Sequence, residues 1–254
     1  MTPDRSDDAE DPAPRPRSPS QARSRRRLEG ILGAADTLLR TSNIEDISLN
    51  DLAREADIPA ASVHYLFPSM VSLQAELRRR YDAAFSRMLV GFHAELAKRP
   101  VSTWQDWIKL EAAHAREHYN LHRPSCEVLL GPLLHRENAM ANLRGNAEVG
   151  ASNLETLRRM FVVPDLPGLE ACFARSCAII ELFWTRSYLA TGTIGDLAFE
   201  HSVRAAVGYL RNFLPEILER RSEDAVAAPQ GRSGRRAGRG PRSLKDRRPP
   251  QGGR

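Results

Sequence analysis

Residues 49–67, LNDLAREADIPAASVHYLF, place two short helical patterns on either side of a break at Asp57-Ile58-Pro59. In the first pattern, Ala53 is the small residue that two closely crossing helices need at their contact. Asp57 stands at the turn, and aspartate adopts a positive φ at modest cost. Three apolar residues can hold the second helix against the first: Ile58, Val63 and Leu66. The spacing predicts a helix-turn-helix.

The second helix of this pair has a face with no apolar anchor. Its members are Ala60, Ala61, Ser62, His64 and Tyr65. Small residues near the helix start allow close approach to a DNA groove, and the two aromatic side chains can reach phosphates or base edges. The alternative is a plain helix corner with two polar-tipped aromatic residues at the surface. The pattern favours a recognition helix that enters the major groove.

Helical periodicity continues through the rest of the chain. Apolar residues recur at spacings of three and four, and no segment alternates as a strand would, so we expect an all-α fold. Ser48 followed by Asp51 predicts a capping box at the start of the second helix. The expected helices cover about 28–42, 49–56, 60–67, 69–89, 103–121, 124–135, 140–161, 169–191 and 196–214.

The composition divides the chain into four parts. Residues 1–23 and 222–254 are rich in Pro, Ser, Gly and charged residues and have almost nothing to bury, so we expect disorder there. Residues 24–72 form the expected DNA-binding domain, and residues 73–221 form a larger helical domain. The net charge of +5 comes from the ends, because residues 28–220 carry a net charge of −4. Basic ends increase non-specific attraction to nucleic acid.

Several classes of protein are disfavoured by the sequence. No apolar run is long enough for a membrane span, and the N-terminus lacks the apolar core of a signal peptide. Three cysteines without CxxC spacing suit a reducing compartment, so we expect a cytoplasmic protein. We find no nucleophile elbow, phosphate-binding loop or zinc-protease motif. We therefore expect neither an enzyme nor a bound cofactor or metal ion.

Three consecutive segments, RRLEGILGAADTLL, ISLNDLAREADIP and ASVHYLFPSMVSL, give a family resemblance. In this order and spacing they resemble the DNA-binding domain of the TetR family of transcriptional regulators, over about a fifth of the chain. The resemblance implies an N-terminal three-helix DNA-binding domain followed by a helical ligand-binding and dimerisation domain. It also implies three partners, which are double-stranded operator DNA, a second copy of the chain, and a small-molecule effector.

The chain departs from the family pattern at several positions. Asp57 replaces the usual turn Gly, Pro59 replaces a Ser, and Ala61-Ser62 replaces a Gly-Thr pair. His64 stands where a phosphate-binding Tyr is usual, and Met70 stands where a Lys is usual. Loss of this Lys removes one ionic phosphate contact. A basic run from Arg23 to Arg27 can compensate by reaching the DNA backbone or minor groove. The expected DNA contacts are Arg26, Arg27, Ser48, Asn50, Ala60, Ala61, Ser62, His64, Tyr65 and Ser69.

The larger domain contains a histidine-rich face. Glu111, His114, His118 and His122 share one side of a helix, which suits a pocket wall, a solvated surface or, less readily, a metal site. Helix faces suggest ligand-binding walls at Trp107, His114, His118, Leu130, Leu157 and Trp184.

The last two helices are the most apolar of the chain. In the TetR family the corresponding helices pair with those of a second copy. A two-fold dimer also suits operator binding, because its recognition helices can enter successive major grooves roughly 34–36 Å apart. The expected interface residues are Phe173, Ile180, Phe183, Tyr188, Val203, Val207, Leu210, Phe213 and Leu214.

Together these expectations describe a homodimeric repressor that a small molecule releases from a palindromic operator. One alternative is a ligand-independent, nucleoid-type DNA-binding protein that uses its basic ends. The other is a helical enzyme with an incidental helix corner.

Overall fold

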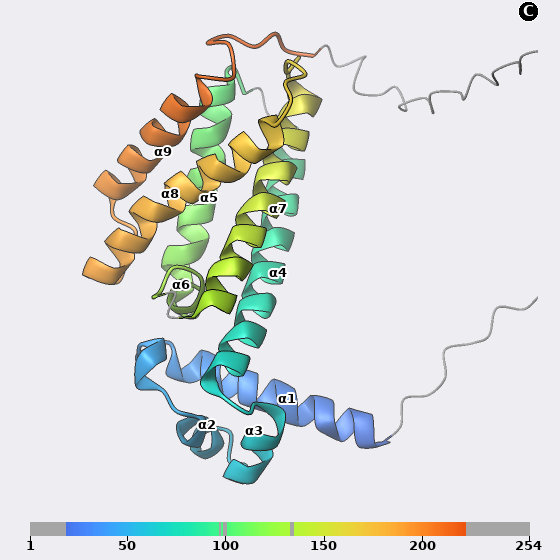
Figure 1. The fold of residues 1–254 in the computed structure, drawn as a ribbon, viewed down its shortest axis with the longest axis vertical. Helices are drawn as coiled ribbons and strands as arrows, with labels where there is room; N and C mark the ends of the chain where they lie inside the picture. Colours follow the sequence, from blue (N-terminus) through green and yellow to red (C-terminus); the bar gives the residue numbers. More distant parts are fainter. Residues whose placement is uncertain (1–18, 97, 99–100, 133–134, 222–254) are drawn as a thin grey trace, which may run out of the picture. The chain divides into compact units, whose positions relative to one another are not determined.

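The computed structural model describes residues 19–96, 98, 101–132 and 135–221 of the chain. Within these residues the protein is all-α, with nine α-helices and one short 3-10 helix (Figure 1). One isolated bridge, between Phe161 and Arg220, is the single β-type pairing found there. The expected all-α class is therefore confirmed. Of the two segments expected to be disordered, 1–23 and 222–254, residues 1–18 and 222–254 lie outside the described residues.

The first helices form the expected three-helix unit at the N-terminal end of a long fourth helix (Figure 1). They are α1 (Pro19–Leu38), the 3-10 helix η1 (Ile44–Asp46), α2 (Leu49–Glu55), α3 (Ala60–Leu66) and α4 (Met70–Leu96). Two expected boundaries fall within helices. Residues 19–23 belong to α1 rather than to an N-terminal arm, because Pro19 is well tolerated in a first helical turn. The expected domain boundary at 72/73 falls inside α4, which runs on without a break.

Five further helices complete the fold. They are α5 (Trp104–Leu121), α6 (Arg123–Leu129), α7 (Arg136–Met160), α8 (Leu169–Thr191) and α9 (Asp196–Leu210). Helix α8 packs between α7 and α9, while α5 contacts α4, α6 and α9. In this arrangement, α4, α5, α7 and α8 enclose a cavity that is described below.

Three helices end earlier than their apolar pattern predicted, and the first is α1, which stops at Leu38 rather than near residue 42. Helix α6 stops at Leu129 rather than near residue 135, because Gly131 and Pro132 follow it. Helix α9 stops at Leu210 rather than Leu214. The side-chain amide of Asn212 donates to the carbonyl oxygens of Gly208 and Tyr209, and Pro215 follows. A following proline disfavours helical conformation in the residue before it.

The buried side chains form two clusters. The first joins α1, α2 and α3 to parts of α4, α5, α6 and α8, so the DNA-binding unit shares a core with the larger domain. The second lies further along the larger domain and centres on Trp104, Trp107, Phe161 and Phe173. The N-terminal unit is thus packed against the larger domain and is not an isolated module.

Helices α7 and α8 approach each other closely at Gly150. A Cβ atom at this position would lie 2.4 Å from the backbone nitrogen of Ala174 and 2.7 Å from its Cα. The expected continuation of a helix through Gly145 and Gly150 is confirmed, and only glycine fits this contact.

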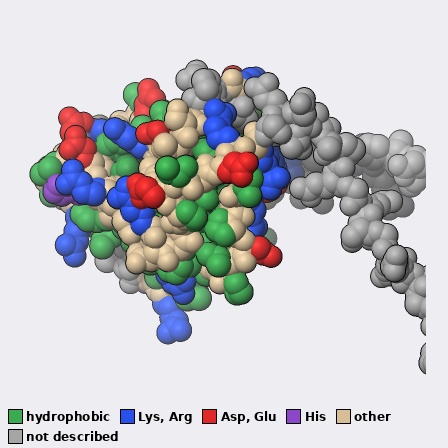
Figure 2. Space-filling view, turned by 90° about the horizontal axis from the view of Figure 1, so that it is seen from above, with side chains coloured by type: hydrophobic (Ala, Val, Ile, Leu, Met, Phe, Trp, Pro, Cys, Tyr) green, Lys and Arg blue, Asp and Glu red, His purple; other side chains and the backbone are tan. Residues whose placement is uncertain are grey.

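The surface is mixed in character. On the face shown in Figure 2, hydrophobic side chains are interspersed with basic and acidic ones. None of the helices in the described ranges combines the length and the apolar character needed to cross a membrane.

Candidate DNA-binding surface and ligand cavity

Helix α2 starts with the capping box that the sequence predicted. The Asp51 N–H donates to Ser48 Oγ at 3.2 Å, and the Ser48 N–H donates to Asp51 Oδ2 at 2.9 Å. The hydrogen bonds from Ser48 lower the pKa of Asp51 to about 2. These bonds satisfy two backbone donors that the first turn would otherwise leave free. They fix the start of the helix on which α3 rests.

The turn between α2 and α3 has the predicted geometry. Asp57 has φ 51° and is the only non-glycine residue with a positive φ in the described chain. The Ile58 N–H donates to the Ala53 carbonyl oxygen at 3.0 Å, which closes the turn. Ala53 and Val63 are both buried at the crossing of the two helices. The predicted helix-turn-helix is confirmed.

The outward face of α3 is accessible. Tyr65 is 83% exposed, Ala60, Ala61 and His64 are exposed, and Ser62 is half-buried. The five other expected contact residues are also exposed, namely Arg26, Arg27, Ser48, Asn50 and Ser69. None of the ten residues expected to contact DNA is therefore buried within the protein.

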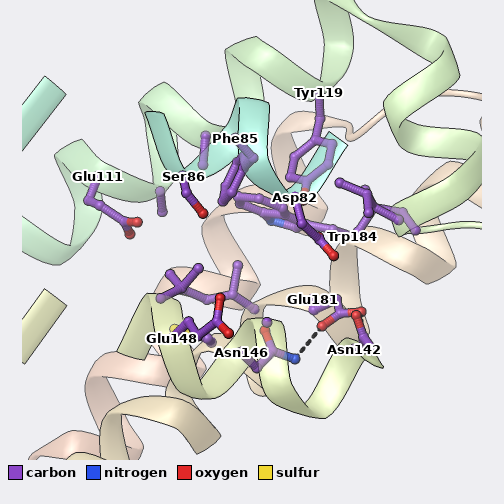
Figure 3. A pocket seen from close by; sticks show the side chains of 18 of the residues that line it. Asp82, Phe85, Ser86, Glu111, Tyr119, Asn142, Asn146, Glu148, Glu181 and Trp184 are labelled. Carbon is purple, nitrogen blue, oxygen red and sulfur yellow. Dashed lines mark hydrogen bonds between the residues drawn. The ribbon is translucent and has the colours of Figure 1, made fainter. Parts of the chain in front are cut away.

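The larger domain contains a cavity of about 80 Å³ between α4, α5, α7 and α8 (Figure 3). Its polar lining consists of Arg78, Asp82, Ser86, Glu111, Asn142, Asn146, Glu148 and Glu181. Three aromatic side chains, Phe85, Tyr119 and Trp184, complete the wall together with aliphatic residues of α5, α6, α7 and α8. An apolar pocket with a few converging polar groups is the usual form of a small-molecule site.

A chain of hydrogen bonds orders the polar side of the cavity. The side-chain amides of Asn142 and Asn146 each donate to one oxygen of Glu181, both at 2.6 Å. Arg78 donates to the side-chain oxygen of Asn142 and, at 3.4 Å, to the Val128 carbonyl oxygen. Side chains from α4, α7 and α8 are thereby held in one arrangement.

Three of the carboxyl groups at the cavity, those of Asp82, Glu111 and Glu181, are partly or wholly buried. Burial raises the pKa of Asp82 to about 6 and the pKa of Glu111 to about 7. It also raises the pKa of Glu181, although the two asparagine amides oppose that change. Carboxyl groups with raised pKa values in a cavity are typical of functional sites.

Only part of the predicted ligand site lies at this cavity. Leu130 and Trp184 line it, whereas Trp107 and Leu157 belong to the second core cluster. The histidines do not line it either. The ring of His114 stacks on Phe92 with centroids 4.2 Å apart, and the ring of His118 lies 5.7 Å from that of Phe85.

The orientation of α5 explains this difference. Its histidine face packs against aromatic residues of α4, and it turns Glu111, Ala112, Ala115 and Tyr119 to the cavity. Two features of the sequence could have located the site, namely Glu181 within an apolar stretch of α8 and the pair Asn142 and Asn146. Among the residues that the structure describes, no group of three or more His, Cys, Asp or Glu is arranged to hold a metal ion.

The expected dimer residues divide between two environments. Five of them are buried within the single chain and belong to its core rather than to an interface, namely Phe173, Tyr188, Val207, Leu210 and Leu214. Ile180 lines the cavity, and Phe183, Val203 and Phe213 are half-buried. The apolar pattern of these two helices did not distinguish the inner face from the outer face.

Other apolar residues of the same helices point to solvent. Leu182 and Leu189 of α8 are 53% and 56% exposed, and Leu197 of α9 is 66% exposed. An unpaired apolar surface on two adjacent helices is typical of a protein interface.

Comparisons with known proteins agree with this architecture. No protein-family model and no curated protein matches the sequence. Among solved structures, a TetR-family transcriptional regulator from Streptomyces coelicolor matches with a TM-score of 0.55 and 16% identity, over 74% of this chain and 99% of that one. A TetR transcriptional regulator from Rhodococcus sp. RHA1 matches with a TM-score of 0.53 and 17% identity, over 74% and 97%.

Proposed function

We propose that this chain, which has the fold of the TetR-family regulators, is a homodimeric DNA-binding transcriptional repressor released from its operator by a small molecule. The observation that carries the proposal is the outward face of α3. Val63 anchors this helix on α2, and the residues that remain free, including Tyr65, face solvent. A short helix held in this way fits the major groove of DNA.

The N-terminal part of α1 would add contacts to the DNA backbone. Arg26 and Arg27 are exposed on α1, and Ser48 and Asn50 are exposed at the start of α2. Arginine side chains and the N-termini of helices are common donors to phosphate oxygens. These contacts would set the orientation of α3, while Ser62, His64 and Tyr65 would contact base edges or nearby phosphates.

The dimer would use the outer faces of α8 and α9. Leu182, Leu189 and Leu197 provide an exposed apolar surface that two copies can share about a two-fold axis. A symmetric dimer presents two α3 helices to the two halves of a palindromic operator.

The effector would bind in the cavity and act through α4 and α6. Helix α4 begins four residues after α3 and lines the cavity with Arg78 and Asp82, so it connects the two sites directly. A ligand that prefers the DNA-free conformation by about 1–3 kcal/mol lowers operator affinity about 5–150-fold.

The cysteines suggest where the protein acts. All three are free thiols, which fits a reducing compartment, and we propose that the protein is cytoplasmic.

The proposal is tested by selecting bound sequences from random double-stranded oligonucleotides with the full-length protein. A palindromic consensus bound by a dimer is the expected result. Binding without sequence preference, together with a steep salt dependence, would instead indicate a nucleoid-type protein. Absence of DNA binding at low salt would refute the proposal.

A further inference from the structure

We propose that the cavity binds an organic cation, with a protonated amine or guanidinium group attached to an aromatic or aliphatic body. The inference rests on the proposed function in one respect, because it names the chemical class of the effector for the same cavity. Three features of the lining support it, namely its charge, the hydrogen bonding of Glu181, and its aromatic walls.

The lining carries more negative than positive groups. Asp82, Glu111, Glu148 and Glu181 come from four different helices, α4, α5, α7 and α8, and surround the cavity in Figure 3. Among the lining residues that the structure describes, Arg78 is the single basic one. With four carboxyl groups against one guanidinium, a cationic ligand would meet more acidic than basic groups and would favour the ionised form of the acids.

Arg78 compensates for only part of these acids, chiefly Asp82. Its terminal nitrogens are directed to the Val128 carbonyl oxygen and the Asn142 side chain. Its Nε lies 3.6 Å from Asp82 Oδ2, too far for a good hydrogen bond, and has no hydrogen-bond partner. Glu111 is only 5% exposed, and its carboxyl group hydrogen-bonds to the side chain of Asn153. A carboxylate buried so deeply is costly unless a counter-charge accompanies it.

Two hydrogen bonds favour the ionised form of Glu181, although burial raises its pKa. Each carboxylate oxygen accepts an N–H from a different asparagine, Asn142 at one oxygen and Asn146 at the other. A protonated oxygen would point its hydrogen at an amide donor and lose one of these bonds. The two amides thus orient the carboxyl group at the cavity wall, and a bound ammonium group would stabilise its ionised form.

The aromatic walls suit the same ligand. The rings of Phe85 and Tyr119 lie 5.2 Å apart, and that of Trp184 meets Tyr119 edge-on at 5.9 Å. Their faces can attract a cation and their area can bury an apolar body. An anionic ligand would face four acids, and a neutral apolar ligand would leave the carboxyl groups without new partners.

The test compares three ligands of nearly equal shape, benzylamine, benzyl alcohol and benzoate. Their binding to the full-length protein is measured by isothermal titration calorimetry, without DNA. We expect benzylamine to bind about tenfold or more tightly than benzyl alcohol, since one charge-assisted hydrogen bond accounts for such a factor. Equal affinity for the amine and the alcohol, tighter binding of benzoate, or no binding of benzylamine would overturn the inference.

Variants that replace one cavity glutamate by glutamine identify the carboxyl group that binds the ammonium group of benzylamine. Glu181→Gln and Glu111→Gln are compared with Glu170→Gln and Glu117→Gln, which lie on the same two helices but are exposed. We expect at least one cavity variant to lose the tenfold preference for benzylamine and both control variants to keep it. Preference retained in both cavity variants would also overturn the inference, and circular dichroism verifies that each variant is folded.

Failure here is distinguishable from failure of the proposed function. Binding of the selected operator DNA is measured on the same preparations by fluorescence anisotropy. Specific DNA binding without a preference for benzylamine would contradict only the inferred ligand class. Loss of specific DNA binding in the wild-type protein would contradict the proposed function, whatever the ligand result.

Discussion

The backbone N–H of Ile44 donates to Glu127 Oε2 at 2.9 Å, and both residues are buried. This bond joins η1 of the DNA-binding unit to α6 of the larger domain. The hydroxyl of Tyr188 on α8 donates to the other oxygen of Glu127. Arg123, one turn before, donates to the carbonyl oxygens of Leu39 and Ser42 at 2.5 and 2.7 Å. Helix α6 is thus fastened to the DNA-binding unit, and any displacement of α6 would be transmitted to it.

The first prediction concerns Glu127→Ala. This change removes the acceptor of two buried donors and leaves Arg123 without its carboxylate partner at 3.1 Å. Breaking such a buried network lowers the free energy of unfolding by about 3–5 kcal/mol. Chemical denaturation measures the loss. Glu117→Ala, at an exposed position of α5, should change stability by less than about 0.5 kcal/mol. A Glu127→Ala protein as stable as the wild type would show that this network does not hold the two units together.

A second prediction concerns Tyr65→Ala. Tyr65 is almost fully exposed on α3, so its removal should leave folding and oligomeric state unchanged. Loss of one direct DNA contact corresponds to about 1–3 kcal/mol, so we expect operator affinity to fall about tenfold or more. Fluorescence anisotropy with the selected operator measures this change. Leu121→Ala, at an exposed position of α5, is the matched control and should bind normally. Unchanged affinity would remove Tyr65 from the DNA contacts.

The sequence features that predicted the DNA-binding surface depend on interactions between residues close together in the chain. The capping pair Ser48 and Asp51, and the turn residue Asp57, fix backbone conformation through neighbouring atoms. The capping box and the turn can therefore both be predicted from the sequence. A positive φ at Asp57 needs a residue that tolerates it, and the apolar residues on either side then determine which face of α3 stays free.

The cavity depends instead on how distant helices are rotated about their axes. Glu111 and His114 are three residues apart on α5, yet Glu111 lines the cavity and His114 stacks on Phe92. The periodicity of α5 shows that its faces differ, but it does not show which neighbouring helix each face meets. The same ambiguity placed Phe173 and Leu210 at an interface rather than in the core.

A third prediction concerns the close contact between α7 and α8. Gly150→Ala would place a methyl group against the backbone of Ala174 and Phe173, where no flexible side chain can move aside. We expect a loss of at least about 1–3 kcal/mol in the free energy of unfolding, as in overpacked cores. Gly91→Ala in α4 meets no atom within 4 Å and should stabilise the protein by about 0.5–1 kcal/mol through helix propensity. Denaturation curves of the two variants that shift in the same direction would contradict this packing.

A fourth prediction concerns His93, which is buried between Trp107, Phe92 and Thr156. Burial, aided by the charge of Arg159, lowers the pKa of His93 to about 4. Between the ordinary pKa of 6.5 and this value, the unfolded chain binds a proton that the folded chain does not. Stability should therefore decrease as the pH falls through this window, by up to about 1.4 kcal/mol per pH unit from this group.

The variant His93→Gln isolates this contribution. Glu111, with its pKa raised to about 7, has the opposite pH dependence, so only the difference between the two proteins is informative. Unfolding by denaturant at several pH values between about 4 and 7 should give a shallower fall in stability for the variant. Parallel curves for the two proteins would show that folding does not lower the pKa of His93.

The last prediction concerns the exposed leucines of α8 and α9. If Leu189 is buried between two copies, Leu189→Glu would place a charge with no partner in an apolar interface, which is costly. We expect a monomer by analytical ultracentrifugation, with secondary structure unchanged because Leu189 is 56% exposed in the single chain. Operator affinity should also fall, since each half-site would then be bound independently. Leu143→Glu, at a similarly exposed position of α7, should remain dimeric. If Leu189→Glu stays dimeric while Leu143→Glu dissociates, the interface lies on α7 and not on the face of α8 that we propose.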